Sequence, residues 1–222
     1  MIKLSDRRFV VLVGNYGSGK TELALNLALA SAEKMTTTLV DLDIVNPYFR
    51  SGEKAEELRN AGVRVLMPTF AMSTVDIPAL PAEIQSVFEQ PSERVIFDMG
   101  GDDTGAAALG RYAPSFRRYR EETTVCLVIN AMRPLTQTAE DVAELAQRIA
   151  ARGRMNIDVI VNNTNLADQT DADMLCMGHQ VAVEAAKLLG VSRVVDVAMP
   201  ELGAAEALPL KRHMAPEWME DA

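Results

Sequence analysis

The sequence predicts a three-layer α/β fold, in which a mainly parallel sheet of roughly seven strands carries helices on both faces. Two observations lead to this prediction. Short apolar runs alternate along the chain with helical patterns, which is typical of βαβ units. The runs are also nearly continuous in hydrophobicity and rich in β-branched residues, as expected for strands that helices cover on both faces.

The expected elements follow in chain order. The predicted strands are Phe9–Val13, Thr37–Asp43, Val63–Met67, Arg94–Asp98, Thr124–Ile129, Ile157–Val161 and Arg193–Ala198. The predicted helices are Lys20–Glu33, Ser51–Asn60, Pro81–Gln90, Gly105–Arg120, Thr138–Arg152 and Gln180–Leu189. Pro114 interrupts the fourth helical pattern, and glycines end several of the others. The tail after Pro200 contains further prolines and is expected to be irregular.

Composition bounds the function. The chain has 222 residues, 48% of them hydrophobic, without repeats or a Pro/Gly-rich linker, so residues 1–222 are read as a single domain. Its 31 acidic and 22 basic residues give a net charge of -9, which disfavours general nucleic-acid binding and anionic lipid. Cys126 and Cys176 form no metal or redox motif. We see no signal peptide and no membrane-length apolar run, and expect a cytoplasmic protein without membrane contact.

The most specific motif lies between the first strand and the first helix. Gly14-Asn15-Tyr16-Gly17-Ser18-Gly19-Lys20-Thr21 matches the P-loop pattern GxxxxGK[ST]. Glycines let the backbone curl so that several N–H groups point at phosphate oxygens, and the helix that follows presents its positive end to the same anion. Lys20 is expected to neutralise the β and γ phosphates, and the Thr21 hydroxyl to ligate Mg²⁺.

Acidic residues end two of the other predicted strands. Val40-Asp41-Leu42-Asp43 ends the second strand, and Asp98 ends the fourth in a Walker B-like pattern, where it would hold Mg²⁺. Gly101 follows Asp98 by three residues, and its backbone N–H could contact a γ phosphate. The carboxyl ends of parallel strands are where an α/β sheet binds its ligand, although a lone acidic residue there is often only a turn cap.

These three segments together resemble the ParA/MinD branch of the SIMIBI-class P-loop NTPases. The resemblance implies that Asp43 positions the attacking water and that Asp41 supports Mg²⁺ from the outer shell. It also implies ATP as the nucleotide and a homodimer or another protein as partner. The second loop residue is Asn15, where the family has a signature lysine that reaches the partner's nucleotide, and the family's membrane-targeting helix has no match in this chain.

The choice of nucleobase is expected to depend on the segment after the sixth predicted strand, Asn162-Asn163-Thr164-Asn165. This segment departs from the guanine-specific NKxD motif. Asn165 takes the place of the aspartate that accepts two hydrogen bonds from guanine, so the sequence favours ATP. The family resemblance implies that Asn162 contacts adenine and that the loop at Pro200 packs against the base. Ordinary strand-to-loop chemistry would explain both residues equally well.

Three functions are compatible with these motifs. We favour an Mg²⁺-ATP-dependent switch with ATPase activity, in which Lys20 and Asp43 are catalytic and a protein partner reads the nucleotide state. A phosphotransferase or ligase similar to dethiobiotin synthetase would need an acceptor pocket, which Phe70–Pro81 and residues 103–120 could form, although neither carries an acceptor signature. A non-hydrolysing nucleotide sensor is the third. An arginine cluster, Arg111, Arg117, Arg118 and Arg120, could serve as a docking patch or supply an arginine to the phosphates, but is read first as a solvated face.

Overall fold

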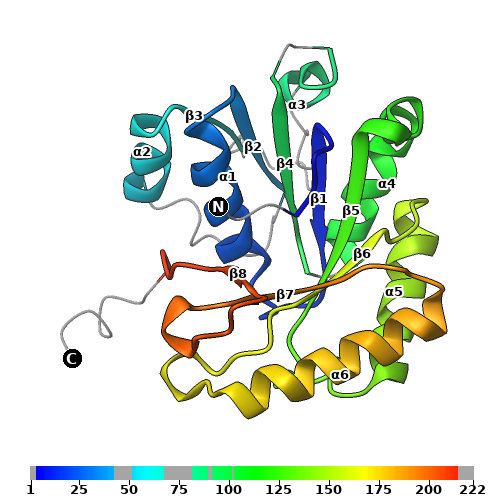
Figure 1. Ribbon diagram of the computed structural model, residues 1–222. Coiled ribbons are helices and arrows are strands. Elements are labelled where there is room, and N and C mark those ends of the chain that lie inside the picture. Colours follow the sequence, from blue (N-terminus) through cyan, green and yellow to red (C-terminus); the bar gives the residue numbers. More distant parts are fainter. Residues whose placement is uncertain (1–3, 43–51, 68–81, 90–91, 102, 215–222) are drawn as a thin grey trace, which may run out of the picture.

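The computed structural model describes residues 4–42, 52–67, 82–89, 92–101 and 103–214, which form one parallel sheet with helices around it (Figure 1). The sheet has eight strands in the order β3-β2-β4-β1-β5-β6-β7-β8. Their bounds are β1 Phe9–Val13, β2 Thr37–Leu42, β3 Val63–Leu66, β4 Arg94–Met99, β5 Thr123–Ile129, β6 Val159–Asn162, β7 Val194–Ala198 and β8 Leu208–Pro209. Every pairing is parallel, with β1 between β4 and β5.

Helices connect consecutive strands and cover both faces of the sheet. They are α1 Lys20–Ala32, α2 Gly52–Asn60, α3 Ala82–Ser86, α4 Asp103–Arg118, α5 Ala139–Gly153 and α6 Ala172–Leu189. One hydrophobic cluster joins one face of the central strands to α3, α4, α5 and α6, whereas a second joins the other face to α1 and α2. The three-layer α/β prediction is therefore confirmed.

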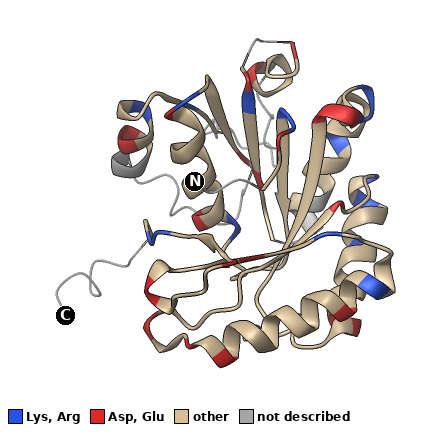
Figure 2. Ribbon diagram, in the orientation of Figure 1, with Lys and Arg blue, Asp and Glu red and all other residues tan. Residues whose placement is uncertain are grey.

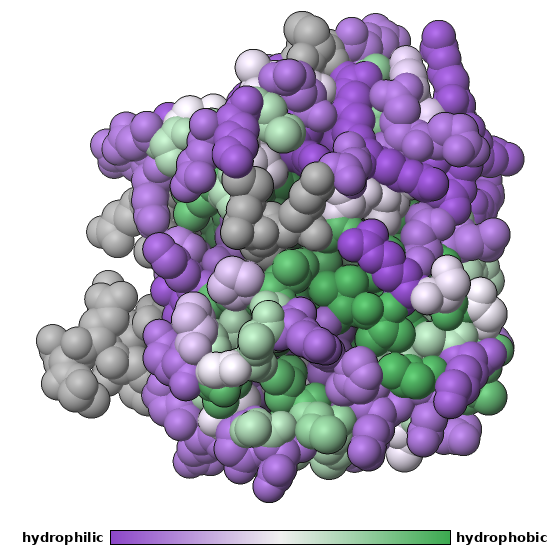
Figure 3. All heavy atoms as spheres, viewed as in Figure 1, coloured by the Kyte–Doolittle hydropathy of each residue, from purple (hydrophilic) through white to green (hydrophobic). Residues whose placement is uncertain are grey.

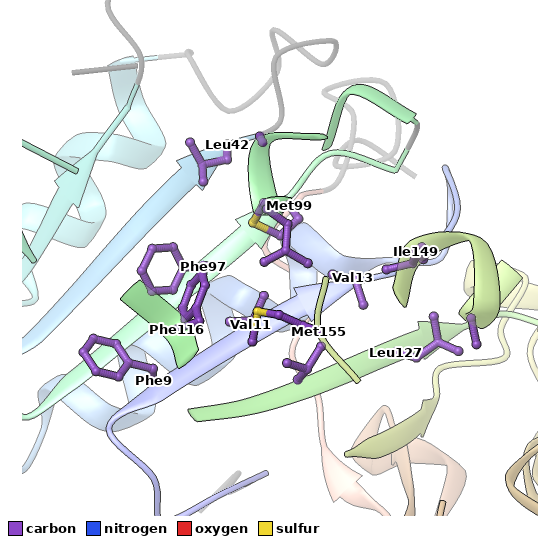
Figure 4. Packing of buried hydrophobic residues seen from close by; sticks show 14 of the residues in the cluster. Phe9, Val11, Val13, Leu42, Phe97, Met99, Phe116, Leu127, Ile149 and Met155 are labelled. Atoms are coloured by element: carbon purple, nitrogen blue, oxygen red, sulfur yellow. The ribbon is translucent and has the colours of Figure 1, made fainter. Parts of the chain in front are cut away.

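Aromatic side chains form the densest part of the first cluster (Figure 4). Phe116 of α4 meets Phe97 of β4 edge to face with ring centroids 5.0 Å apart, and Phe88 at 5.1 Å. Phe9 of β1 lies 5.3 Å from Phe88 and 6.5 Å from Phe116. Offset and edge-to-face aromatic contacts of this kind stabilise a core beyond the area that they bury. They fix α4 against β1 and β4, the strands whose carboxyl ends carry the P-loop and Asp98.

Several element boundaries differ from the sequence prediction. The predicted strands all form with small shifts at their ends, and β8 is an additional, two-residue strand in the tail that was expected to be irregular. Helix α6 begins at Ala172 rather than at Gln180, because Asp171 caps it by accepting a hydrogen bond from Met174 N at 2.8 Å. Helix α4 continues through Pro114, which removes one backbone donor without ending the helix.

The remaining surface is polar around the edge of the molecule. Figure 3 shows hydrophilic side chains around the edge of this face and hydrophobic side chains toward its centre, and Figure 2 shows that both acidic and basic residues occur around it. Burial raises the pKa of the Cys126 thiol to about 12, so this side chain is neutral and belongs to the core. Across the described part of the chain, no helix combines the length and apolar character that a membrane crossing requires.

Replacing the central aromatic ring of α4 should strongly destabilise the fold. We expect Phe116→Ala to lower the free energy of unfolding by about 3–5 kcal/mol, because it removes a fully buried ring and leaves a cavity. Leu188→Ala is the matched control, since this leucine of α6 is 58% exposed and should cost less than about 0.5 kcal/mol. Urea unfolding followed by circular dichroism measures both values, and equal stability of the two variants would contradict the packing described above.

Candidate functional site: a nucleotide-binding P-loop

The loop between β1 and α1 adopts a conformation that requires glycine. Gly14 has φ 152° and Gly19 has φ 83°, both in the left-handed range that residues with a side chain rarely adopt. A Cβ on Gly14 would overlap the carbonyl oxygen of Val128 in β5, and a Cβ on Gly19 would overlap Asn163 Nδ2. The glycines therefore let the loop curl tightly between β5 and the loop that follows β6.

Lys20 lies at the start of α1 with its side chain folded back over this loop. Only 5% of the residue is exposed, and Nζ donates a hydrogen bond to Asn15 O at 2.9 Å. Thr21 follows in the first helical turn and is partly exposed, as a metal-ligating hydroxyl must be. The two residues line a cavity of about 660 Å³ together with Asn15, Tyr16, Gly17 and Gly19. The sequence-predicted phosphate cradle is thus assembled in one place.

The acidic strand ends lie beside each other, as parallel strands require. Asp41 of β2 pairs in register with Asp98 of β4, and both are buried, at 3% and 0% exposure. Gly101 lies against the P-loop, since a Cβ there would be 2.6 Å from Tyr16 N. Asp43 lies outside the described residues. The segment Phe70–Pro81, expected to form part of an acceptor pocket, also lies outside the described residues.

A hydrogen bond joins the loop after β6 to the P-loop. Its donor is Asn163, next to Asn162, the residue that we expected to contact the base. Asn163 Nδ2 donates to Ser18 O at 2.7 Å. Asn162 is fully buried: Nδ2 donates to Leu175 O and Asp196 Oδ1, and Oδ1 accepts from the Thr164 hydroxyl. Its amide therefore holds the loop to α6 and β7 and does not line the adjacent cavity.

That cavity has a volume of about 310 Å³ and opens beside Gly17 and Gly19. Its polar lining includes Asn163, Asn165, Glu22 and Arg212. Its apolar lining comprises Val197, Ala198, Met199, Leu202, Leu210 and Met214. Pro200 is exposed and is not part of the wall, whereas Met199 before it is. An apolar cavity lined with a few polar groups is typical of a small-molecule site, and this one lies next to the P-loop.

The C-terminal segment forms one wall of this cavity, which sequence reasoning missed. Leu210 N donates to Ala198 O at 2.8 Å, and the Asn26 amide pairs with the backbone N–H and C=O of Lys211, both at 2.8 Å. The Glu22 carboxylate accepts from the backbone N–H groups of His213 and Met214. No local pattern in the tail predicts the contacts with Asn26 and Glu22, because these partners lie 185 to 192 residues earlier in the chain.

The predicted arginine cluster divides among structural roles. Arg120 forms an ion pair with Asp158, whose carboxylate also accepts from Val125 N at 2.8 Å. Arg117 Nε donates to Ala113 O within α4 at 3.4 Å. Among the described residues, no group of three or more His, Cys, Asp or Glu side chains gathers as a metal centre.

Solved structures share this architecture. FtsY from Mycoplasma mycoides superposes with a TM-score of 0.54 at 17% identity, covering 93% of this chain and 63% of FtsY. FlhF complexed with GTP/Mg²⁺ gives 0.50 at 16%, covering 86% and 64%. This chain has a P-loop NTPase fold. A nucleotide-binding protein from Archaeoglobus fulgidus in complex with ADP gives 0.50 at 16% identity, covering 97% and 91%.

The sequence comparisons add nothing to this likeness. No protein-family profile and no curated protein matches the chain. The chain spans less than two thirds of the length of FtsY and of FlhF. At these identities the superpositions show the fold alone, so activity and partners have to be argued from the site.

A methyl group on α6 should disturb the loop that borders the cavity. A Cβ on Gly178 would overlap Thr164 Oγ1 and Asn162 Oδ1, so we expect Gly178→Ala to lower the free energy of unfolding by about 1–3 kcal/mol despite the better helix propensity of alanine. Met177→Ala, next in the helix and 40% exposed, is the control. Urea unfolding measures the difference, and a stabilised Gly178→Ala variant would contradict the close approach of α6 to this loop.

Proposed function

We propose that this chain binds Mg²⁺-ATP and acts as a ParA/MinD-like, nucleotide-dependent molecular switch that a protein partner reads. The observation that carries the proposal is the pairing of a complete phosphate cradle with the cavity bordered by Asn163 and Met199. Lys20 lies at the cradle, and the cavity of about 310 Å³ has the apolar walls that a purine ring requires. We propose further that the protein is cytoplasmic and that it does not bind nucleic acids in general.

The side chains around the cradle fit a magnesium ion. Mg²⁺ prefers oxygen ligands and is usually bound through one or two carboxylates, a hydroxyl, water and substrate phosphates. Thr21 is the proposed direct ligand, and Asp98 and Asp41 support the ion, since buried carboxylates generally pair with a cation or with other polar groups. When bound, the ion would neutralise negative charge on the phosphates.

The cavity lining favours adenine over guanine. Guanine recognition depends on a carboxylate that accepts two hydrogen bonds, and Glu22 is the only carboxylate among the residues described around this cavity. Both Glu22 oxygens already accept backbone N–H groups of the C-terminal segment. Asn165, in the place of the guanine-binding aspartate, donates to Asn163 O at 2.8 Å. We therefore assign the base contacts to Asn163, Asn165 and the backbone near Met199 and Pro200, rather than to Asn162.

A switch requires that the phosphate end of the nucleotide touches a segment that can respond. Gly101 lies against Tyr16 of the P-loop, so the β4–α4 loop is in a position to sense a γ phosphate. Hydrolysis would return the switch to its diphosphate state. The residues that we propose for hydrolysis are Lys20, which stabilises charge on the phosphates, and Asp43, which positions the attacking water.

Removing the P-loop cation should abolish useful nucleotide affinity. We expect Lys20→Ala to weaken Mg²⁺-ATP binding by at least about tenfold, because a hydrogen bond between charged groups contributes on the order of 1.5–3 kcal/mol. Lys187→Ala on the exposed end of α6 is the charge-matched control. Isothermal titration calorimetry on folded variants measures the affinities, and unchanged binding by Lys20→Ala would rule out the cradle as the phosphate site.

ATP should bind more tightly than GTP, by about tenfold or more, because the one carboxylate among the described lining residues, that of Glu22, is already engaged by backbone donors. Competition binding at equal Mg²⁺ compares the two nucleotides directly. Asn165→Asp supplies the missing carboxylate and should shift the preference toward GTP. Tighter binding of GTP by the wild-type chain would overturn our assignment of the base.

A further inference from the structure

An arginine that no P-loop motif includes lies across the phosphate cradle. A Cβ built on Gly17 would be 3.5 Å from Arg133 Nε, 3.7 Å from its Cδ and 3.9 Å from its Cγ. Arg133 lines the same cavity of about 660 Å³ as Lys20 and Thr21. Its side chain is exposed, and among the described residues it has no side-chain hydrogen bond or ion pair that would occupy the guanidinium.

The loop that carries Arg133 is held in a single conformation by buried asparagine and threonine side chains. Asn130, 1% exposed, accepts Met132 N at its Oδ1 at 3.0 Å and Arg133 N at its carbonyl at 3.0 Å. The Thr136 hydroxyl donates to Asn130 O at 2.7 Å and to Arg133 O at 3.2 Å. These bonds form a tight turn between β5 and α5 with Arg133 at its tip.

The turn is also tied to the P-loop itself. Asn15 Nδ2, within the P-loop, donates to the carbonyl of Pro134 at 3.2 Å. Asn130 Nδ2 donates to Asn165 O at 3.0 Å, which joins the same turn to the loop beside the base cavity. The backbone that positions Arg133 is therefore held by hydrogen bonds without a nucleotide, so that a contact by its side chain has to order the side chain but not the loop.

A nucleotide triphosphate brings several negative charges to a protein whose own net charge is -9. The nearest acidic side chain in this cavity, Glu22, has both oxygens bonded to backbone donors. Arg133 is the second cation that lines the cavity, after Lys20. A guanidinium donates to phosphate oxygens in a planar, often bidentate geometry, and such charge-assisted bonds are stronger than neutral ones.

We propose that Arg133 binds the phosphate chain of the nucleotide from within the same subunit, as a second positive group beside Lys20. This inference rests on the proposed function and adds to it a residue from outside the P-loop motif. Asn15 acts as a positioning residue, since its amide fixes the turn from which Arg133 extends.

The test compares Mg²⁺-ATP affinity among wild type, Arg133→Ala, Arg133→Lys and Arg59→Ala, using the full chain and isothermal titration calorimetry. Arg133→Ala should weaken binding by about tenfold to a hundredfold, the range for losing one hydrogen bond between charged groups, and Arg133→Lys should recover part of it. Arg59→Ala changes the same charge on an exposed position of α2 and should bind like wild type.

Two further readouts separate phosphate binding from a structural role. The salt dependence of ATP affinity should become shallower in Arg133→Ala, because one ionic contact is lost. The thermal unfolding temperature of the nucleotide-free variant should equal that of wild type, since the side chain is exposed. Wild-type affinity and salt dependence in Arg133→Ala would overturn the inference alone, whereas a wild-type chain that binds no nucleotide would overturn the proposed function with it.

Discussion

The P-loop holds its shape only because Gly14 and Gly19 take up backbone angles that side chains would forbid, and the neighbouring loops are built around that shape. Val128 O occupies the space where a Cβ of Gly14 would be, and the Asn163 amide occupies that of Gly19. The backbone of the cradle is therefore in contact with β5 on one side and with the β6–α6 loop on the other. Any side chain at either glycine would push these elements apart and open the site.

Hydrogen bonds of asparagine side chains connect the P-loop to the loops around it. Asn163 links the P-loop to the loop that follows β6, and Asn15 links the P-loop to the turn after β5. Asn130 links that turn to the loop that follows β6. An amide can donate and accept at once, so each residue connects two backbone segments that have no regular secondary structure. Hydrogen-bond networks of this kind, buried at Asn130 and Asn163, hold the loops in fixed positions relative to one another.

The C-terminal segment completes the site from the far end of the chain. It reaches back to Asn26 and Glu22 on α1, the helix that begins at Lys20, and so places Leu210 and Met214 on the wall of the base cavity. Helix α1, which begins at Lys20 of the P-loop, thus also anchors a wall of the cavity beside Gly17 and Gly19. The P-loop and the wall of this cavity are therefore linked through a single helix, α1.

The sequence by itself determined the sheet, its parallel direction, the cradle at Gly14–Thr21 and the position of Asp41 and Asp98 at strand ends, whereas the structure decided that these two strands are neighbours. These follow from local causes: hydrophobic periodicity, the glycine pattern, and the rule that parallel strands end on one edge. Tertiary structure alone decided that Asn163 rather than Asn162 faces the P-loop, that the tail forms a wall, and that Arg133 lies over Gly17. Both amides are buried, but a shift of one residue at the end of β6 turns a side chain from α6 and β7 to the P-loop. Contacts between segments more than a hundred residues apart leave no local pattern in the sequence.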